Sequence, residues 1–273
     1  PSILILSPMK IPAFIIIPHG GYLVPEEMAD YSTLTEFDCF LEADTSANQI
    51  FNLSHETLGF IDSQVSRLFI DLDRPPYSMP PVSQDGVIKK ETSGGRDIFR
   101  EDCFPDEIAL ASMLKRYYFP YHSTIEKIMK SGEPAFVLEC HTMMPVAPER
   151  DHDAGAPRPL ILIEDMVETR RGEERTCPPK LSEGFREELA KSFRDEDTTA
   201  AGRSVIGEPG KGRYILGKYG RGDLPMLRVS LSRSLFLNEK DFSYEFMSVN
   251  PLRIEDLREK FLSALSRFMK NYF

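Results

Sequence analysis

The chain has 273 residues, a formal net charge of −10 and a sequence pI near 5.1. A chain of this length can bury one large core, so we predict a single domain over residues 1–273. Acidic and basic residues are interspersed along the chain. This argues against a nucleic-acid partner, which requires a basic face for its phosphates.

No targeting or membrane-spanning segment is predicted. The first apolar stretch, residues 3–17, is interrupted by two prolines and a lysine and lacks the basic front and cleavage site of a signal peptide. No later stretch reaches the roughly 18 to 20 apolar residues that cross a bilayer. We therefore expect a cytoplasmic protein without a membrane partner. We expect reduced thiols at the four scattered cysteines, Cys39, Cys103, Cys140 and Cys177.

The first half of the chain alternates apolar runs with polar stretches. Continuous apolar runs at residues 13–18 (AFIIIP) and 65–71 (VSRLFID) predict strands buried on both faces. Residues 42–52 have helix-compatible spacing. Residues 75–104 begin with a stretch rich in Pro, Ser and Gly, which predicts a long surface excursion.

The second half repeats this alternation. Apolar residues recur at three- and four-residue intervals over 105–129, broken by Pro120, which predicts two helices or one kinked helix. A third buried strand is predicted at 135–140 (AFVLEC), with further strands at 159–163 and 227–231 and amphipathic helices at 181–193 and 254–272. Strands that alternate with helices predict a three-layer α/β fold whose sheet is mixed but mostly parallel, with helices on both faces.

Two predicted strands end in a histidine, His19 (IIIPHGG) and His141 (VLECHT). Ligands of open α/β sheets bind beyond the carboxyl ends of the strands, so both imidazoles are expected at one edge. A catalytic zinc takes three protein ligands and leaves one position open, so a third ligand is required. The alternative for either histidine is an ordinary hydrogen-bonded residue of the core or surface. Gly20 and Gly21 have their own alternative role, a tight turn with positive φ.

An ordered series of motifs carries a resemblance to a known family. The motifs are PHGGYLVP, EADT, SRLFIDLDRPP, YYFPYH, ECHTMMP, GRYILGKYG and SLSRSLFL. In this order and spacing they resemble the N-formylglutamate amidohydrolase family, from about residue 14 to residue 268. The resemblance implies a phosphorylase/hydrolase-like fold, related to that of the zinc carboxypeptidases, and hydrolysis of a linear amide.

The resemblance also implies roles for particular residues. It makes His19 and His141 metal ligands, with Asp44 as the third and Glu42 in reserve. The alternative for Asp44 is a helix N-cap. Glu139 matches an acidic position of the family, and on a strand it lies on the same side as His141, so it is expected to orient that imidazole. His122 is expected to bind substrate or to assist proton transfer, the alternative being a helix-packing imidazole.

Arginines that match the family pattern imply a carboxylated substrate. At two other positions the sequence departs from that pattern. Arg67, Asp71 and Arg74 match a family pattern that suits a glutamate-like carboxylate, and the alternative is a surface salt-bridge network. Arg233 is retained as well. Ser230 stands where the family usually has the glutamate that serves as general base. Arg213 stands at a usual glycine and would fill or recharge the pocket, so the substrate need not be N-formylglutamate itself.

The resulting prediction is a metal-dependent hydrolase, with one divalent ion and zinc as the expected metal, that cleaves an N-acylated amino acid or a similar small carboxylated amide. The alternative, favoured by Ser230, is a catalytically impaired family member that binds a small anionic ligand or a partner protein. A Cys140 nucleophile with His141 as its base is disfavoured, because neighbours on a strand point to opposite faces. The oligomeric state stays open.

Overall fold

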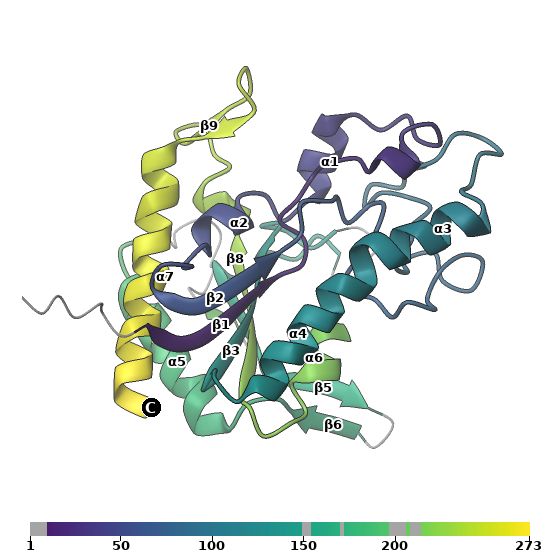
Figure 1. Cartoon of the computed structure of the whole chain (residues 1–273). Helices are drawn as coiled ribbons and strands as arrows, with labels where there is room; N and C mark the ends of the chain where they lie inside the picture. The colour runs from purple at the N-terminus through teal and green to yellow at the C-terminus, as the bar shows by residue number, and fades with distance from the viewer. Residues whose placement is uncertain (1–9, 149–153, 170–171, 197–205, 208–213) are drawn as a thin grey trace, which may run out of the picture.

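The computed structural model describes residues 10–148, 154–169, 172–196, 206–207 and 214–273. Within these residues, a mixed six-stranded sheet forms the centre of the protein (Figure 1). The strand order is β2-β1-β3-β8-β4-β7. Strands β2 (Thr57–Asp62), β1 (Ile11–Ile17), β3 (Phe136–Met143) and β8 (Met226–Ser232) run parallel. Strand β4 (Ile161–Glu164) runs antiparallel to β8, and β7 (Ile206–Gly207) pairs with β4. The predicted α/β fold with a mostly parallel sheet is confirmed.

Helices cover both faces of the sheet (Figure 1). Alternate residues of β1 point to opposite faces: Ala13, Ile15 and Ile17 join one core cluster, and Phe14 and Ile16 join the other. The first cluster contains residues of α2 (Ala47–Ile50), α5 (Pro179–Ser192) and α7 (Pro251–Tyr272). The second contains residues of α1 (Glu36–Glu42), α3 (Glu107–Met113), α4 (Phe119–Ser131) and α6 (Tyr214–Tyr219).

The remaining elements are short. They comprise 3-10 turns at Glu26–Met28 and Arg233–Leu235, a hairpin of β5 (Met166–Thr169) and β6 (Gly172–Arg175), and a hairpin of β9 (Phe242–Ser243) and β10 (Ser248–Val249). A π-helical segment, Leu114–Tyr118, joins α3 to α4, and Pro120 lies in the first turn of α4. The irregularity predicted near Pro120 is therefore present as a π-helical segment within a continuous helical stretch, and His122 lies in the first turn of α4.

The strand predicted at residues 65–71 is wrong. This segment makes a helical turn, in which the amides of Phe69 and Ile70 donate to the carbonyl of Ser66. Its apolar residues do enter the second core cluster, so the run correctly marked burial but not strand. The second strand is β2, whose residues are mostly half-buried because it lies at the sheet edge. A short apolar run cannot by itself distinguish a strand from a turn of helix.

The helix suggested at residues 42–52 is interrupted. Helix α1 ends at Glu42 and α2 begins at Ala47, and between them Ser46 adopts a positive φ of 61°. The backbone amide of Asp44 donates to the carbonyl of His19 at 2.9 Å. The break therefore ties Asp44 to the end of β1.

The predicted surface excursion at residues 75–104 is only partly at the surface. It contains isolated β-bridges in place of longer strands. Val87, Ile88 and Ile98 are buried in the second core cluster, and the amide of Asp71 donates to the carbonyl of Val87 at 2.8 Å. The excursion thus packs against the segment that carries Asp71.

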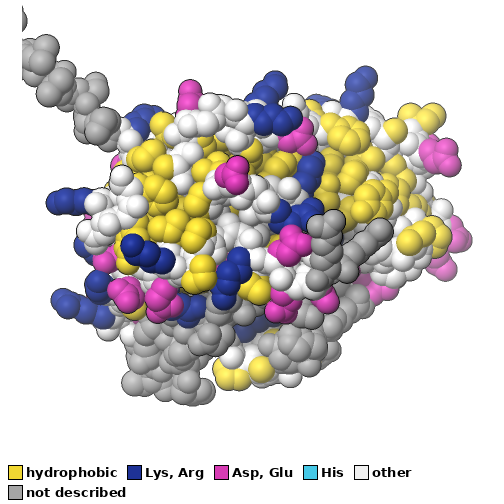
Figure 2. All heavy atoms as spheres, turned by 90° about the horizontal axis from the view of Figure 1, so that it is seen from below, with side chains coloured by type: hydrophobic (Ala, Val, Ile, Leu, Met, Phe, Trp, Pro, Cys, Tyr) yellow, Lys and Arg dark blue, Asp and Glu magenta, His cyan; other side chains and the backbone are white. Residues whose placement is uncertain are grey.

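Two features bear on the partners expected from the sequence. No helix in the described part of the chain is long and apolar enough to cross a membrane. On the face shown in Figure 2, basic and acidic side chains are interspersed among hydrophobic ones, and the basic ones do not form one continuous area there.

Candidate metal centre

His19 and His141 come together at the carboxyl edge of the sheet, as predicted. His19 follows β1 by two residues, and His141 lies near the end of β3. Their ring centroids are 5.2 Å apart and both side chains are buried. Two histidines that are distant in the sequence thus lie next to each other in the fold.

Asp44 lies between the two imidazoles. Its Oδ2 atom is 2.6 Å from His141 Nδ1 and 3.7 Å from His19 Nδ1. One ligand atom from each of these three residues lies within 4.8 Å of the other two. The alternative of an N-cap does not apply, because Ser46 is the N-cap residue of α2 and the Asp44 carboxylate turns toward His141. Glu42, the reserve candidate, instead accepts hydrogen bonds from Ser93.

The outer nitrogen of each imidazole is held by a carboxylate. His19 Nε2 donates to Asp71 at 2.7 Å, and His141 Nε2 donates to Glu139 at 2.8 Å. Because a carboxylate only accepts, these bonds place a proton on both Nε2 atoms and aim both Nδ1 atoms at Asp44. Glu139 thus contacts the imidazole of His141, and the orienting role expected for it stays a prediction. Asp71, expected to bind substrate, is fully buried and spends its oxygens on protein groups.

The donor set fits a divalent metal ion. His19 Nδ1 is buried and has no hydrogen-bond partner, which is costly for a polar atom. Two imidazole nitrogens and one carboxylate form a ligand set used by catalytic zinc sites. Such a cation would satisfy the unpartnered nitrogen of His19.

Electrostatics around these residues favour charged carboxylates. Burial by itself would raise the pKa of Asp44, but His141 and His19 hold it well below its usual value. Burial likewise opposes ionisation of Asp71, yet His19, Lys89 and Arg67 hold its pKa well below its usual value. Burial and Arg228 disfavour the charged form of His141, but Asp44 and Glu139 raise its pKa.

Arg67 and Arg233 approach the centre from two sides. Arg67 Nη1 and Arg233 Nη2 each lie 3.7 Å from Asp44 Oδ1, beyond hydrogen-bond distance. Arg67 also binds Asp71, and its side chain is 23% exposed. Arg233 is further held by the Leu41 carbonyl at 2.8 Å. Both guanidinium groups thus face the same carboxylate oxygen without a close bond to it.

Arg74 is bound by groups other than His19, Asp44 and His141. Arg74 binds Asp85 through Nη2 at 2.6 Å and donates to the Asp73 carbonyl, which fits the salt-bridge alternative. Lys89, which the sequence reasoning missed, joins Asp85 to Asp71. Arg213 lies outside the described residues, so its predicted role in the pocket stays a prediction.

His122 lies in an aromatic environment. Its Nε2 donates to the Leu72 carbonyl at 3.0 Å, and its Nδ1 accepts from the Tyr219 hydroxyl at 2.8 Å. The Tyr118 ring centroid is 4.2 Å from that of His122. Burial lowers the pKa of His122 to about 4. Its contacts fit the helix-packing alternative and position the segment that carries Asp71 and Asp73.

Ser230 is the register partner of His141 on the neighbouring strand, so both side chains lie on the same face of the sheet. Two residues earlier on β8, the buried Arg228 binds Asp73 at 2.8 Å and Glu139 at 3.1 Å. Sequence reasoning missed Arg228. The signal was the polar series Arg228, Ser230 and Ser232 at every second position of an otherwise apolar strand.

A family model and two solved structures place the chain among known proteins. The model of the N-formylglutamate amidohydrolase family matches residues 11–237. The chain belongs to this family. The N-formylglutamate amidohydrolase from Ralstonia eutropha JMP134 is similar in structure, with a TM-score of 0.67 and 16% sequence identity over 96% of this chain and 95% of that one.

A gene product from Agrobacterium tumefaciens has a TM-score of 0.62 and 17% identity over 94% of this chain and 92% of its own. At such identities the likeness shows that the N-formylglutamate amidohydrolase fold is shared. No curated protein matches the chain.

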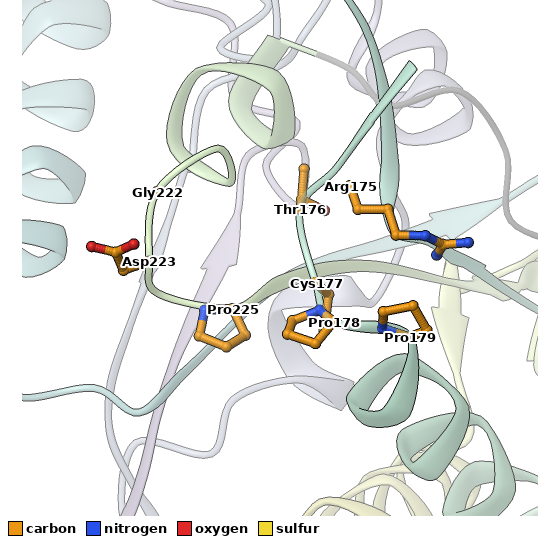
Figure 3. A pocket seen from close by; sticks show the side chains of 8 residues that line it. All are labelled: Arg175, Thr176, Cys177, Pro178, Pro179, Gly222, Asp223 and Pro225. Atoms are coloured by element: carbon orange, nitrogen blue, oxygen red, sulfur yellow. The ribbon is translucent and has the colours of Figure 1, made fainter.

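The cavity shown in Figure 3 lies away from the candidate metal centre. It has a volume of about 280 Å³ and is lined by Arg175, Thr176, Cys177, Pro178, Pro179, Gly222, Asp223 and Pro225. Pro225 immediately precedes β8, so the cavity lies at the amino edge of the sheet, opposite the histidines. Burial raises the pKa of the Cys177 thiol to about 12, which disfavours a nucleophilic role. All four cysteines are free, as expected.

Proposed function

We propose that this chain hydrolyses the amide of a small N-acylated amino acid and that His19, Asp44 and His141 hold one divalent metal ion for this reaction. The observation that carries the proposal is the unpartnered, buried Nδ1 atom of His19, which faces Asp44 beside His141. Zinc, the expected metal, supplies Lewis-acid chemistry at a site of this kind.

The carboxylates around the histidines prepare them as ligands. Asp71 and Glu139 keep the protons on the Nε2 atoms, so that each Nδ1 can present a lone pair. Arg67 and Lys89 in turn hold Asp71. The imidazoles are thereby fixed before any ligand binds, which favours tight and selective metal binding.

Arg67 and Arg233 are suited to hold the substrate carboxylate. Both guanidinium groups face Asp44 Oδ1 at 3.7 Å, and neither is saturated by it. When Asp44 serves a metal ion, these N–H groups are available to a second anion beside it. Arginine binds carboxylates through paired hydrogen bonds and would orient the substrate amide toward the histidines.

Activity can be tested directly with purified protein. N-formyl, N-acetyl and N-carbamoyl amino acids are assayed with Zn²⁺, Mn²⁺ or Co²⁺ added. We expect turnover that requires metal and that is abolished in His19→Ala and His141→Ala. His55→Ala is the matched control, because His55 is an exposed histidine outside the centre. Full turnover in either of the first two variants would exclude this mechanism.

Ser230 supports a second candidate function. A serine hydroxyl lacks the basicity of the glutamate usual in the family, and general base catalysis is worth about 10²- to 10⁴-fold. Two other carboxylates lie next to the histidines, but Asp71 accepts a hydrogen bond from His19 and Glu139 accepts one from His141. A non-catalytic protein that binds a small carboxylate would show saturable binding of N-acyl amino acids without turnover across the whole panel.

A further inference from the structure

Arg228 is surrounded by carboxylates beneath the histidines. Its Nη1 atom lies 2.8 Å from Asp73 Oδ2 and 3.1 Å from Glu139 Oε1, and its Nε atom lies 3.2 Å from Glu164 Oε2. The four side chains come from β8, β3, β4 and the turn after Leu72, and all are buried. One guanidinium therefore hydrogen-bonds two buried carboxylates through Nη1 and lies near a third, although its buried Nε atom has no hydrogen-bond partner.

This position has the properties of a cation site. Ligand atoms of Asp73, Glu139 and His141 lie within 4.8 Å of one another, which makes them a second group with metal-ligand spacing. Glu139 Oε2 is fully buried and has no hydrogen-bond partner. Carboxylate oxygens are the ligands that hard cations such as Mn²⁺ prefer. The guanidinium of Arg228 lies among these oxygens.

His141 explains why an arginine suits this position better than a second metal ion. A neutral imidazole offers one lone pair, and in the proposed centre the Nδ1 lone pair of His141 would be used by the metal ion that Asp44 also binds. The Nε2 proton then binds Glu139 at 2.8 Å, on the oxygen that Arg228 also contacts. Arg228 forms an ion pair with the Glu139 carboxylate and does not compete for the lone pair of His141.

We propose that Arg228 is a built-in cation that fills a second metal position and so limits the centre to one metal ion. Arg228 is thus a positioning residue: it holds Glu139, which holds His141. This inference rests on the metal centre proposed above. Its test counts bound metal ions and does not require hydrolysis.

The test compares wild-type protein with Arg228→Met and Arg228→Lys. Each is dialysed against Mn²⁺ alone or Zn²⁺ alone, and bound metal is counted by elemental analysis. Arg228→Met removes the charge at similar length, so we expect it to bind one equivalent of Mn²⁺ more than wild type. Arg228→Lys keeps the charge and should bind the same number as wild type. The double variant Arg228→Met/Asp73→Asn should lose the extra equivalent.

Thermal unfolding provides the second measurement. Unpaired buried carboxylates should lower the Tm of Arg228→Met by about 10 °C. Added Mn²⁺ should restore this Tm at concentrations that no longer raise the Tm of wild type. If Arg228→Met is unfolded without metal, Mn²⁺ should refold it. Equal metal counts in Arg228→Met and wild type, or failure of Mn²⁺ to stabilise or refold the variant, would overturn the proposal. Loss of hydrolysis alone bears only on the proposed function.

Discussion

Asp71 and His19 are 52 residues apart in the chain, and their side chains meet at 2.7 Å in the interior of the protein. The same carboxylate receives Arg67 at 3.0 Å and Lys89 at 3.0 Å. A residue expected to bind substrate thus forms the support of a histidine.

Asp71→Asn should weaken metal binding about 10- to 100-fold, because the amide holds the Nε2 proton of His19 less firmly. Asp85→Asn is the matched control, since Asp85 also binds Lys89 but does not contact His19. Metal affinity is measured by competition with a chelator. Unchanged affinity in Asp71→Asn would show that the support of His19 is dispensable.

Arg67→Met should raise KM for a carboxylated substrate about 10- to 100-fold, as expected for loss of a charge-assisted hydrogen bond. Arg67→Lys should give a smaller rise, because it keeps the charge but loses the paired geometry. Arg96→Met, which removes an exposed arginine bound to Asp38, should leave KM unchanged. Steady-state kinetics on one N-acyl amino acid decide the matter, and equal KM values would remove Arg67 from the substrate site.

Gly21→Ala should destabilise the fold by about 3 kcal/mol and disturb His19. A Cβ atom at Gly21 would lie 2.1 Å from the backbone carbon of Gln64, whereas at Gly20 it would lie 3.1 Å from Asn48 Cβ. Neither residue is among the described glycines with positive φ, so close backbone approach, and not the predicted turn conformation, requires glycine here. Gly20→Ala is the paired control and should cost about 1 kcal/mol in urea unfolding. Equal costs would contradict this account.

His122 should make the fold sensitive to mild acid. Its pKa is about 4 in the folded protein, below the usual 6.5, so the unfolded state binds a proton first as the pH falls. The stabilisation by neutral His122 is complete above pH 6.5 and declines toward pH 4. We expect a loss of about 2 kcal/mol between pH 7 and pH 5 that is missing in His122→Gln. Urea unfolding of both proteins at the two pH values measures it, and parallel losses would refute it.

The sequence predicted the parts of the fold that depend on strong periodicity. The runs that became β1, β3 and β8, and the long helices α5 and α7, have clear apolar patterns because they are buried on one or both sides. The edge strand β2 was missed because its half-exposed residues carry little pattern. The turn after Val65 was read as a strand because burial alone makes a run apolar.

The candidate site was only partly predictable for a different reason. His19 and His141 could be paired, because the carboxyl ends of parallel strands lie at one edge. Asp71, Lys89 and Arg228 could not be given their roles, because these depend on which side chains the loops bring into contact. From the sequence, Asp44 could be either a metal ligand or a helix N-cap. The structure distinguishes these, because the break between α1 and α2 directs its carboxylate toward His141.

The strand order has a consequence for how the centre assembles. The contact between Arg228 and Asp73 spans 155 residues, and that between His141 and Asp44 spans 97. Contacts so distant in sequence form slowly, because the chain loses the entropy of a long loop before it gains the contact energy. A nascent chain that has not yet reached β8 would leave Glu139 without its cation. On this view the centre would be limited to one metal ion only after β8 has brought Arg228 into the sheet.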